Sequence, residues 1–406
     1  MAGIVRYGSY VPFFRLQRSA IGGGRGQRAT ASYDEDSVSM AVEAARDALE
    51  GAPAIDTLLF ATTSPPYAEK LNAALIQAAL DLPETVRSLE LGASSRMGLA
   101  ALLLGADIAA AGRTGLVCAG DVMVGAPGGA RESQSGDAAV AFVTGADDQS
   151  IARFVGRASA TTEVLDVWRL PEDRFAKQWE ERFGAEVLAP VIVDTATRAL
   201  ADAGVEPTDL KTVILDGTNM RAARSLPAAL RLKPDQLADT LDTSVGRAGA
   251  AHAGLLLARA LDTASAGDRI LVTCLGDGCD ALVLEVTEAI ESALPRHPVD
   301  GWIASKQDDL AYNSYLKWRG VLPFEPPRRP DPERPAAPRC DAMSAGRWRS
   351  SARAVAPAGP GTFPHSGSVS NAKPSTRCSP SPSQTRAAAS RPTPSITSPT
   401  AFSHRS

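Results

Sequence analysis

The two halves of this sequence resemble each other segment by segment. Four segments of the first half recur in the second half in the same order, with similar apolar and glycine positions. The matching pairs are 57–66 with 212–221, 95–107 with 246–257, 114–121 with 268–277, and 136–143 with 279–286. A long internal repeat in one order is typical of a duplicated supersecondary unit. The repeat therefore predicts an α/β protein built from two copies of one unit, with a paired active site where equivalent segments meet.

Each half contains a helix that is apolar on every side. Residues 92–112 read GASSRMGLAALLLGADIAAAG, and residues 246–265 repeat this pattern. A helix that is apolar all round is a buried helix, and close packing around it favours Gly and Ala. We therefore expect the two helices to lie at the centre of the molecule, between two sheets.

Capping residues and apolar runs predict several further elements. Asp34, Asp36 and Ser37 can cap a helix that stops at Gly51. The other expected elements are a strand over 4–12, a buried strand over 56–62, a helix over 70–81, a strand over 88–91 and an amphipathic helix over 308–320.

The repeat and the composition together divide the chain into five parts. They are a first half over 1–150, a cap or insertion over 151–190, a second half over 191–295, a helix and proline-rich linker over 296–338, and a low-complexity tail over 339–406. The insertion carries Trp168 and Trp179 among charged residues, and it is either a cap over a pocket or a packed surface segment. We expect the Ser-, Pro-, Arg- and Ala-rich tail to be disordered. A natural tail and an out-of-frame reading of a GC-rich gene both explain its composition.

Charge and cysteine usage exclude several classes of protein. The net charge is −4, so no basic surface indicates nucleic-acid binding. No apolar run is long enough to span a bilayer, and the N-terminal residues do not resemble a signal peptide. The cysteines form no CxxC pair, which favours a reducing cytoplasm and argues against a structural zinc or other metal site. They are Cys118, Cys274, Cys279, Cys340 and Cys378.

Three motifs resemble those of the thiolase superfamily over roughly residues 2–290. They read GASSRMGLAALL at 92–103, RESQSGDAAVAFV at 131–143 and GDRILVTCLGDG at 267–278. The resemblance is to hydroxymethylglutaryl-CoA synthase-like proteins, with ketoacyl synthase III as a more distant relative. It implies a five-layered αβαβα fold, a homodimer, and a tunnel for an acyl-CoA substrate with no further cofactor. It also implies a cytoplasmic enzyme of lipid metabolism.

The same resemblance implies that four family positions carry unusual residues. Ser95 matches the nucleophilic cysteine, Asp216 the catalytic histidine, Arg247 the asparagine at the second glycine turn, and Thr63 the acid/base glutamate. A helix N-terminus stabilises a thiolate, but a serine hydroxyl needs an adjacent base to become nucleophilic. We therefore expect Ser95 and Asp216 to be catalytic, and Arg247, Thr63 and Asn219 to contact the substrate.

Cys274 is a third candidate for catalysis. TCLGDG resembles the strand and turn on which biosynthetic thiolases carry a proton-shuttling cysteine, so Cys274 is expected to be either such a group or a small buried hydrophobe. Cys118 occupies the equivalent strand of the first half. His252 is expected to be a hydrogen-bonded core histidine. Asp137 and Asp280 are repeat-equivalent and are expected to cap the turns that precede two strands.

Three functions remain open at the level of sequence. The chain is an enzyme that makes or breaks a carbon–carbon bond next to a CoA thioester, a retro-aldolase that needs no nucleophilic cysteine, or a non-catalytic subunit that binds acyl-CoA. Residues 300–338 resemble the helix and linker that enter a zinc-ribbon and OB-fold module, which implies a partner protein of that type.

Overall fold

The computed structural model describes residues 2–323 and Glu325, all within the first of the chain's two units, Met1–Arg339. The predicted tail over 339–406 and nearly all of the predicted proline-rich linker lie outside the described residues. None of the helices in this described part is long and apolar enough to cross a membrane.

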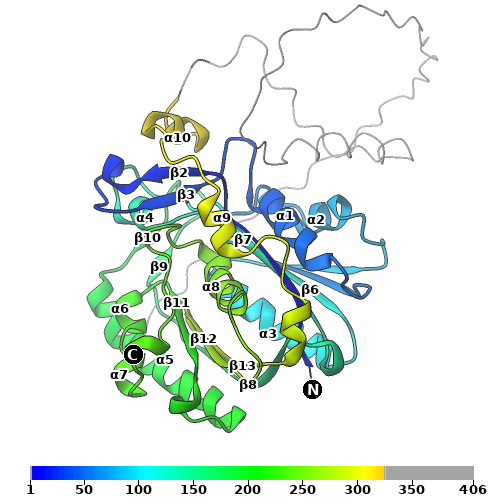
Figure 1. Ribbon diagram of the computed structural model, residues 1–406. Coiled ribbons are helices and arrows are strands. Elements are labelled where there is room, and N and C mark those ends of the chain that lie inside the picture. The colour runs from blue at the N-terminus through cyan, green and yellow to red at the C-terminus, as the bar shows by residue number, and fades with distance from the viewer. Residues whose placement is uncertain (1, 324, 326–406) are drawn as a thin grey trace, which may run out of the picture. The chain divides into compact units, whose positions relative to one another are not determined.

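Nine strands form one continuous sheet in the order β11-β12-β13-β8-β1-β7-β6-β4-β5 (Figure 1). The run β1-β7-β6-β4 contains two antiparallel pairs and then a parallel pair, and the run β8-β13-β12-β11 repeats this pattern. The duplication seen in the sequence is therefore a duplication of structure. The strands are β1 Ala2–Tyr10, β4 Thr57–Ala61, β5 Arg87–Leu91, β6 Gly115–Asp121, β7 Ala138–Ala146, β8 Ala152–Thr161, β11 Thr212–Gly217, β12 Arg269–Leu275 and β13 Gly278–Val286.

The two halves of the sheet differ in how they begin and end. Two separate sheets were expected, but β1 and β8 join the halves where Gly3 pairs with Arg153 and Ile4 with Ala152. At the outer edge of the first half, β5 pairs in parallel with β4. Beside β11 in the second half, the corresponding place holds only an isolated bridge between Val213 and Leu237.

The two halves of the sheet, β1-β7-β6-β4-β5 and β8-β13-β12-β11, form two layers, and helices form the other three. The central helices α3 (Met97–Ala110) and α8 (His252–Leu261) belong to one hydrophobic cluster that also contains strand residues of both halves. Two further clusters lie under the outer helices, one in each half. The layers therefore follow the predicted order αβαβα (Figure 1). The outer helices are α1 Ser37–Leu49 and α2 Ala73–Ala79 in the first half, and α5 Glu181–Ala203, α6 Met220–Ala223 and α7 Leu226–Ala229 in the second.

The boundaries of the segment between the halves differ from the expected cap over 151–190. Strand β8 occupies its first part and is the second-half counterpart of β1, while α5 begins at Glu181. Only residues 162–180 lie outside the repeat, and they contain a small hairpin of β9 (Val167–Trp168) and β10 (Lys177–Gln178). Strand β8 was not predicted from the sequence, because it is only partly buried and its exposed face carries charged residues.

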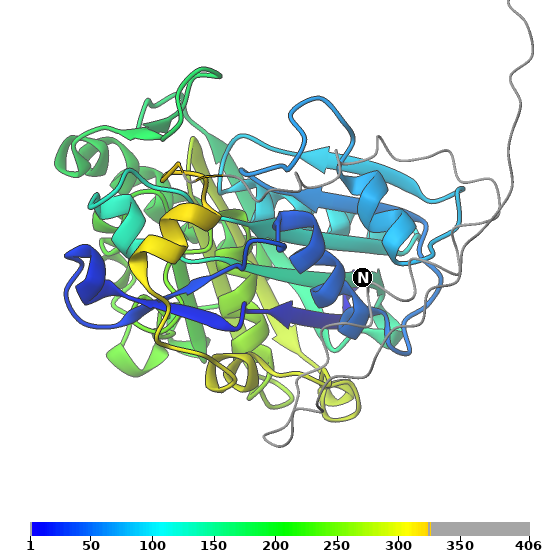
Figure 2. The ribbon, with the colours of Figure 1, turned by 90° about the horizontal axis from the view of Figure 1, so that it is seen from above.

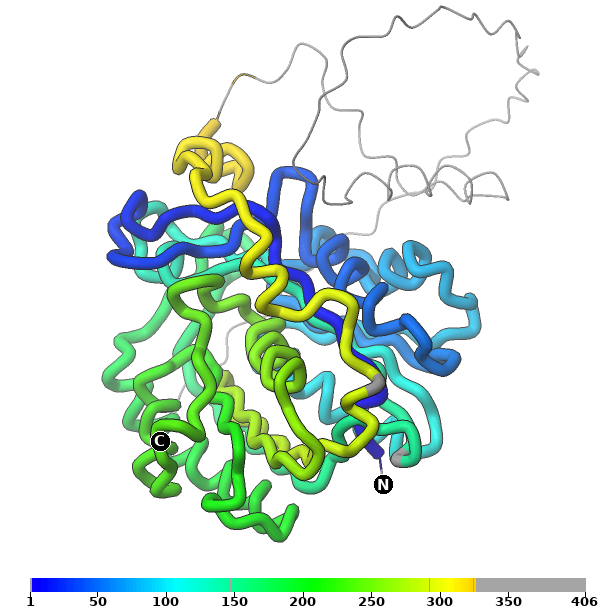
Figure 3. The backbone as a smooth tube through the Cα atoms, viewed as in Figure 1, coloured from blue at the N-terminus to red at the C-terminus, as the bar shows by residue number. Residues whose placement is uncertain are grey.

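The C-terminal part of the described chain runs along the N-terminal part, and we call residues 297–322 the strap. It contains α9 (Val299–Ala304) and α10 (Tyr312–Trp318), the latter within the helix predicted over 308–320. The strap crosses the hairpin of β2 (Phe14–Gln17) and β3 (Gln27–Thr30), as the yellow and blue segments of Figures 2 and 3 show.

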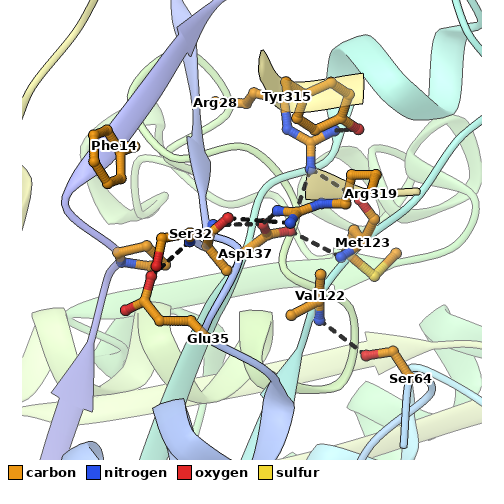
Figure 4. A network of polar contacts seen from close by, with 12 residues as sticks. Phe14, Arg28, Ser32, Glu35, Ser64, Val122, Met123, Asp137, Tyr315 and Arg319 are labelled. Carbon is orange, nitrogen blue, oxygen red and sulfur yellow. Dashed lines mark hydrogen bonds and ion pairs between the residues drawn. The ribbon is translucent and has the colours of Figure 1, made fainter. Parts of the chain in front are cut away.

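Asp137 fastens the strap to the first half. Its buried carboxylate accepts hydrogen bonds from the N–H groups of Ala31 and Met123 and forms ion pairs with Arg28 and Arg319 (Figure 4). The centroid of the Tyr315 ring lies 5.1 Å from the Arg28 guanidinium and 5.3 Å from that of Arg319. Asp137 was expected to cap a turn, and it does more, because it joins β3, the loop after β6 and the strap.

Candidate active site

The candidate site lies where the start of α3 meets the turn between β12 and β13. Ala93 has a φ of +77°, a left-handed conformation that reverses the chain between β5 and α3. A Cβ atom on Gly276, in the β12–β13 turn, would lie 3.0 Å from Ser94 Oγ, so a glycine allows the turn to approach the serines closely. The first half thus supplies Ser94 and Ser95, and the second half supplies the opposing turn.

Asp216 and Cys274 form a buried pair on the second-half side of this turn. They are paired neighbours on the parallel strands β11 and β12, and Cys274 Sγ lies 3.6 Å from Asp216 Oδ2. Burial, followed by the charge of Asp216, raises the pKa of the Cys274 thiol well above its ordinary value. Cys274 is therefore a thiol that donates to Asp216, and this environment disfavours the thiolate that a nucleophile or a proton acceptor requires.

Thr63 binds a carboxylate that sequence reasoning missed. Asp121, at the end of β6, is fully buried and accepts hydrogen bonds from both the N–H and the hydroxyl of Thr63 and of Ser64. It also accepts from the Thr62 hydroxyl and from the N–H of Ala250, which follows the glycine turn of the second half. Burial raises the pKa of Asp121, and these hydrogen bonds oppose the rise. The signal that could have found it is the GD dipeptide at 120–121, which repeats at 276–277.

Gly249 allows the approach of the second glycine turn to Asp121. Its φ is +55°, and a Cβ atom at this position would overlap the Asp121 carboxylate. The turn therefore needs glycine for its backbone conformation and for space. Through Asp121, the Thr63 loop of the first half is tied to the 249–251 turn that leads into α8.

Arg247 and Asn219 are bound to other parts of the fold. The Arg247 N–H donates to Gln134 O over 2.9 Å, and its Nε lies 3.4 Å from Asp242 Oδ1. No ion pair between Arg247 and Asp216 exists among the described residues. Asn219 caps α6 by accepting from the Ala222 N–H, and its amide donates to Glu181 O. Both side chains have structural partners in this state.

Buried polar atoms without a hydrogen-bond partner gather around the junction. Because buried polar groups are nearly always hydrogen bonded, such atoms mark a place for a ligand or water. Thr218 lies next to the β12–β13 turn, since its N–H donates to Leu275 O, which precedes Gly276. Asp280 was expected to cap a turn, but it lies within β13, paired with Cys274 of β12. The atoms in question are Ser94 Oγ, Ser95 Oγ and Thr218 Oγ1, together with Arg96 Nε and Asp280 Oδ2, which form an ion pair with each other at 3.7 Å.

His252 is buried at the start of α8, but its Nδ1 atom has no hydrogen-bond partner. His252 is therefore a core residue as expected, but the expected hydrogen bond is not found at Nδ1. Within residues 2–323, no group of three or more His, Cys, Asp or Glu side chains is placed to hold a metal ion. The site thus offers hydroxyls, a carboxylate paired with a thiol, and backbone N–H groups at glycine turns.

Comparisons with known proteins agree with this architecture. Residues 200–286 match the family model for the C-terminal part of 3-oxoacyl-[acyl-carrier-protein] synthase III. The chain is 29% identical over 346 residues to hydroxymethylglutaryl-CoA synthase of Methanopyrus kandleri, covering 79% of this chain and 98% of that protein. It is 30% identical over 342 residues to the same enzyme of Aeropyrum pernix, covering 79% and 95%.

A solved structure points to the same fold. The structure of MvaS in complex with 3-hydroxy-3-methylglutaryl coenzyme A superimposes with a TM-score of 0.65 at 19% identity, and the match covers 82% of this chain and 94% of that one. Together with the duplicated αβαβα layers, these similarities show that the chain belongs to the hydroxymethylglutaryl-CoA synthase family of the thiolase superfamily.

Proposed function

We propose that this chain binds an acyl-CoA at the junction of Ser95 and Asp216 and makes or breaks a carbon–carbon bond next to the thioester without forming an acyl-enzyme. Its relatives are hydroxymethylglutaryl-CoA synthases, and a solved relative holds 3-hydroxy-3-methylglutaryl coenzyme A. In our reading of the motifs, the family's cysteine, histidine, asparagine and glutamate are replaced by Ser95, Asp216, Arg247 and Thr63.

The observation that carries the proposal is the pairing of Asp216 with the Cys274 thiol, together with a buried Ser95 hydroxyl that has no base. Ser95 Oγ is buried and has no hydrogen-bond partner, so nothing activates it as a nucleophile. Asp216 can accept a proton when a substrate hydroxyl displaces or joins the thiol. This set of groups favours acid–base chemistry over acyl transfer.

An aldol-type reaction fits these groups and balances without a covalent intermediate. In the cleavage direction, Asp216 takes the proton from the β-hydroxyl of a β-hydroxyacyl-CoA, the α–β carbon bond breaks, and a carbonyl product forms. The electron pair of that bond passes to the thioester as an enolate, which backbone N–H groups at the glycine turns stabilise. The proton held by Asp216 returns to the α-carbon, and the condensation direction is the reverse.

Two measurements test this mechanism together. Intact-protein mass spectrometry after incubation with short and branched acyl-CoAs should show no adduct, and turnover of a β-hydroxyacyl-CoA should survive Ser95→Ala. Asp216→Asn should lower turnover by about 100- to 10,000-fold, the usual contribution of a general base, whereas Cys118→Ala serves as a buried control in the first half. An acyl adduct at Ser95 would contradict the proposal and indicate a serine-based synthase.

The second candidate is a non-catalytic subunit that binds acyl-CoA. It is favoured by the Arg247–Asp242 ion pair, which engages the residue at the position of the family's asparagine. In this case Asp216→Asn would leave every measured rate unchanged, while acyl-CoA binding would persist. The search would then turn to a catalytic partner, for which the expected zinc-ribbon and OB-fold protein is the first choice.

We also propose a homodimer that forms along β5. This strand is at the edge of the sheet, and no described strand pairs with its outer side. Leu89 and Leu91 pack against the central hydrophobic cluster but stay only partly buried, and a second copy along this edge would cover the part that remains exposed. Light scattering should give twice the monomer mass, and Leu89→Lys should reduce it to the monomer mass.

A further inference from the structure

Arg131 carries a guanidinium group that no part of the described protein binds. It lies on α4 (Ala130–Gln134), its Nε atom is buried without a hydrogen-bond partner, and no hydrogen bond or ion pair joins its side chain to any residue in 2–323. A guanidinium has five N–H donors and no acceptor. Leaving such donors unpaired in a partly buried place costs free energy, so the arrangement indicates a missing acceptor.

The carboxylate whose charge acts on Arg131 cannot be that acceptor. Burial lowers the pKa of Arg131, and the charge of Asp121 opposes this effect. The Asp121 oxygens, however, already accept hydrogen bonds from Thr62, Thr63, Ser64 and Ala250. A carboxylate has about four lone-pair sites. Asp121 therefore acts on Arg131 through its charge alone, and the N–H donors of the Arg131 guanidinium have no hydrogen-bond acceptor among the described residues.

A second arginine of the insertion acts on Arg131 through its charge. Arg169 follows β9 and its side chain is exposed. Among the described residues, its guanidinium makes one long hydrogen bond of 3.4 Å to Asp173 O, and its charge contributes to lowering the pKa of the Asp173 carboxyl. The positive charge of Arg169 also lowers the pKa of Arg131, so the two guanidinium groups repel each other. An anion between them would relieve this repulsion and accept from both forks.

Hydrogen bonds on both sides of α4 hold the segment that carries Arg131 beside the second glycine turn. The last residue of α4, Gln134, accepts the Arg247 N–H, and Gly136 donates to Arg247 O. On the other side of α4, the Glu132 carboxylate accepts from the Gly128 N–H and from the Tyr312 hydroxyl of the strap. These hydrogen bonds on both sides of α4 therefore fix the backbone that carries Arg131.

We propose that Arg131, assisted by Arg169, binds an anionic oxygen group of the substrate. The chemistry suits a carboxylate at the far end of the acyl chain and equally a phosphate of coenzyme A. This inference rests on the proposed acyl-CoA function and adds the class of substrate group that the site selects. Arg131 would then be a substrate-binding residue that the motif comparison, which selected Ser95, Asp216, Arg247 and Thr63, did not identify.

Calorimetric titration of the full chain separates the two sources. Glutaryl-CoA and valeryl-CoA are titrated into the wild type, Arg131→Gln and Arg131→Lys, with Arg198→Gln as a control at an exposed arginine on α5. If the anion is the acyl carboxylate, Arg131→Gln weakens glutaryl-CoA binding about 10- to 100-fold and valeryl-CoA binding less than about twofold, and lysine restores part of the loss. If it is a phosphate, both ligands weaken equally, while binding of glutaryl-pantetheine is unchanged.

Equal affinities of the wild type and Arg131→Gln for all these ligands, with an unchanged melting temperature, would overturn the inference. If the wild type binds no CoA thioester at all, the proposed function fails separately. Glutarate and inorganic pyrophosphate are then titrated alone. Binding that depends on Arg131 would support the anion site without the acyl-CoA function, and binding that does not depend on it would remove both.

Discussion

Asp137 and Asp280 occupy equivalent places in the two halves of the fold, yet Asp137 has more hydrogen-bond and ion-pair partners than Asp280. Asp137 is fully buried and is bound by Arg28, Arg319 and two backbone N–H groups. Asp280 is also buried, and it forms one ion pair, with Arg96 Nε at 3.7 Å, and a hydrogen bond with the Ser159 side chain. Its Oδ2, however, has no hydrogen-bond partner. Burial raises the pKa of Asp280. In the first half, Asp137 thus fastens the strap to the rest of the protein, whereas in the second half Asp280 Oδ2 has no hydrogen-bond partner.

The largest effect that this comparison predicts is on stability. Asp137→Ala leaves Arg28 and Arg319 buried without an anion, and breaking such a buried pair costs about 3 to 5 kcal/mol in the free energy of unfolding. Urea denaturation measures the loss, and Asp137→Asn, which keeps the shape and one acceptor, should cost less. A loss below about 1 kcal/mol for Asp137→Ala would show that Asp137 is no more structural than Asp280.

The ends of the two central helices give a second contrast, which depends on pH. Helix α3 is followed by Ala111 and α8 by Asp262, which accepts hydrogen bonds from the Tyr7 hydroxyl and the Val299 N–H. Burial first, then the nearby Asp300 charge, raises the pKa of Asp262 to about 6, while these hydrogen bonds and Arg259 lower it. A raised carboxyl pKa stabilises the fold at low pH, and this contribution is lost as the pH rises from about 4 through 6.

Asp262→Asn removes this dependence. Between pH 4 and pH 7, the unfolding free energy of the variant should gain about 1 to 2 kcal/mol relative to the wild type, after allowance for solvent screening of a partly exposed group. Thermal unfolding at the two pH values measures the difference. Parallel pH profiles for the two proteins would show that Asp262 titrates as it does in the unfolded chain.

The repeat-equivalent cysteines provide a smaller and sharper test. Cys118 and Cys274 are both buried, and burial raises the pKa of each thiol. Replacing either by alanine should cost about 1 kcal/mol, because a small buried apolar group is removed. Only Cys274→Ala should also lower turnover, by about tenfold, since it removes the donor that orients Asp216. Equal turnover of the two variants would show that the Cys274 thiol does not orient Asp216 for catalysis.

The sequence was sufficient for the architecture because the repeat and the helix periodicity are local patterns. They predicted the duplicated unit, the central position of α3 and α8, and a capped helix beginning near Asp36. They could not predict the junction of β1 with β8, because two residue pairs leave no pattern in either strand.

The site was harder to predict because its partners come from distant parts of the chain. The importance of Asp121 depends on Ala250, 129 positions away, and the isolation of Arg131 depends on the acceptors that Asp121 has already used. Motif matching selected Asp216 and Cys274 as separate candidates, and it did not predict their pairing, which depends on the register of the neighbouring strands β11 and β12. It did not reveal that Asn219 is a helix cap, since the same amide could face a substrate.

The smallest predicted effect compares the first turns of α1 and α5, the outer helices of the two halves. Asp36 caps α1 by accepting the Ser39 N–H over 2.7 Å, and the Ser39 hydroxyl accepts the Asp36 N–H in return. Glu180, at the same place before α5, makes no side-chain capping bond. Asp36→Ala should therefore cost about 1 kcal/mol in the free energy of unfolding, and Glu180→Ala less than about 0.5 kcal/mol. Chemical denaturation of both variants measures this difference, and equal losses would mean that the first turn of α5 has a cap of comparable strength.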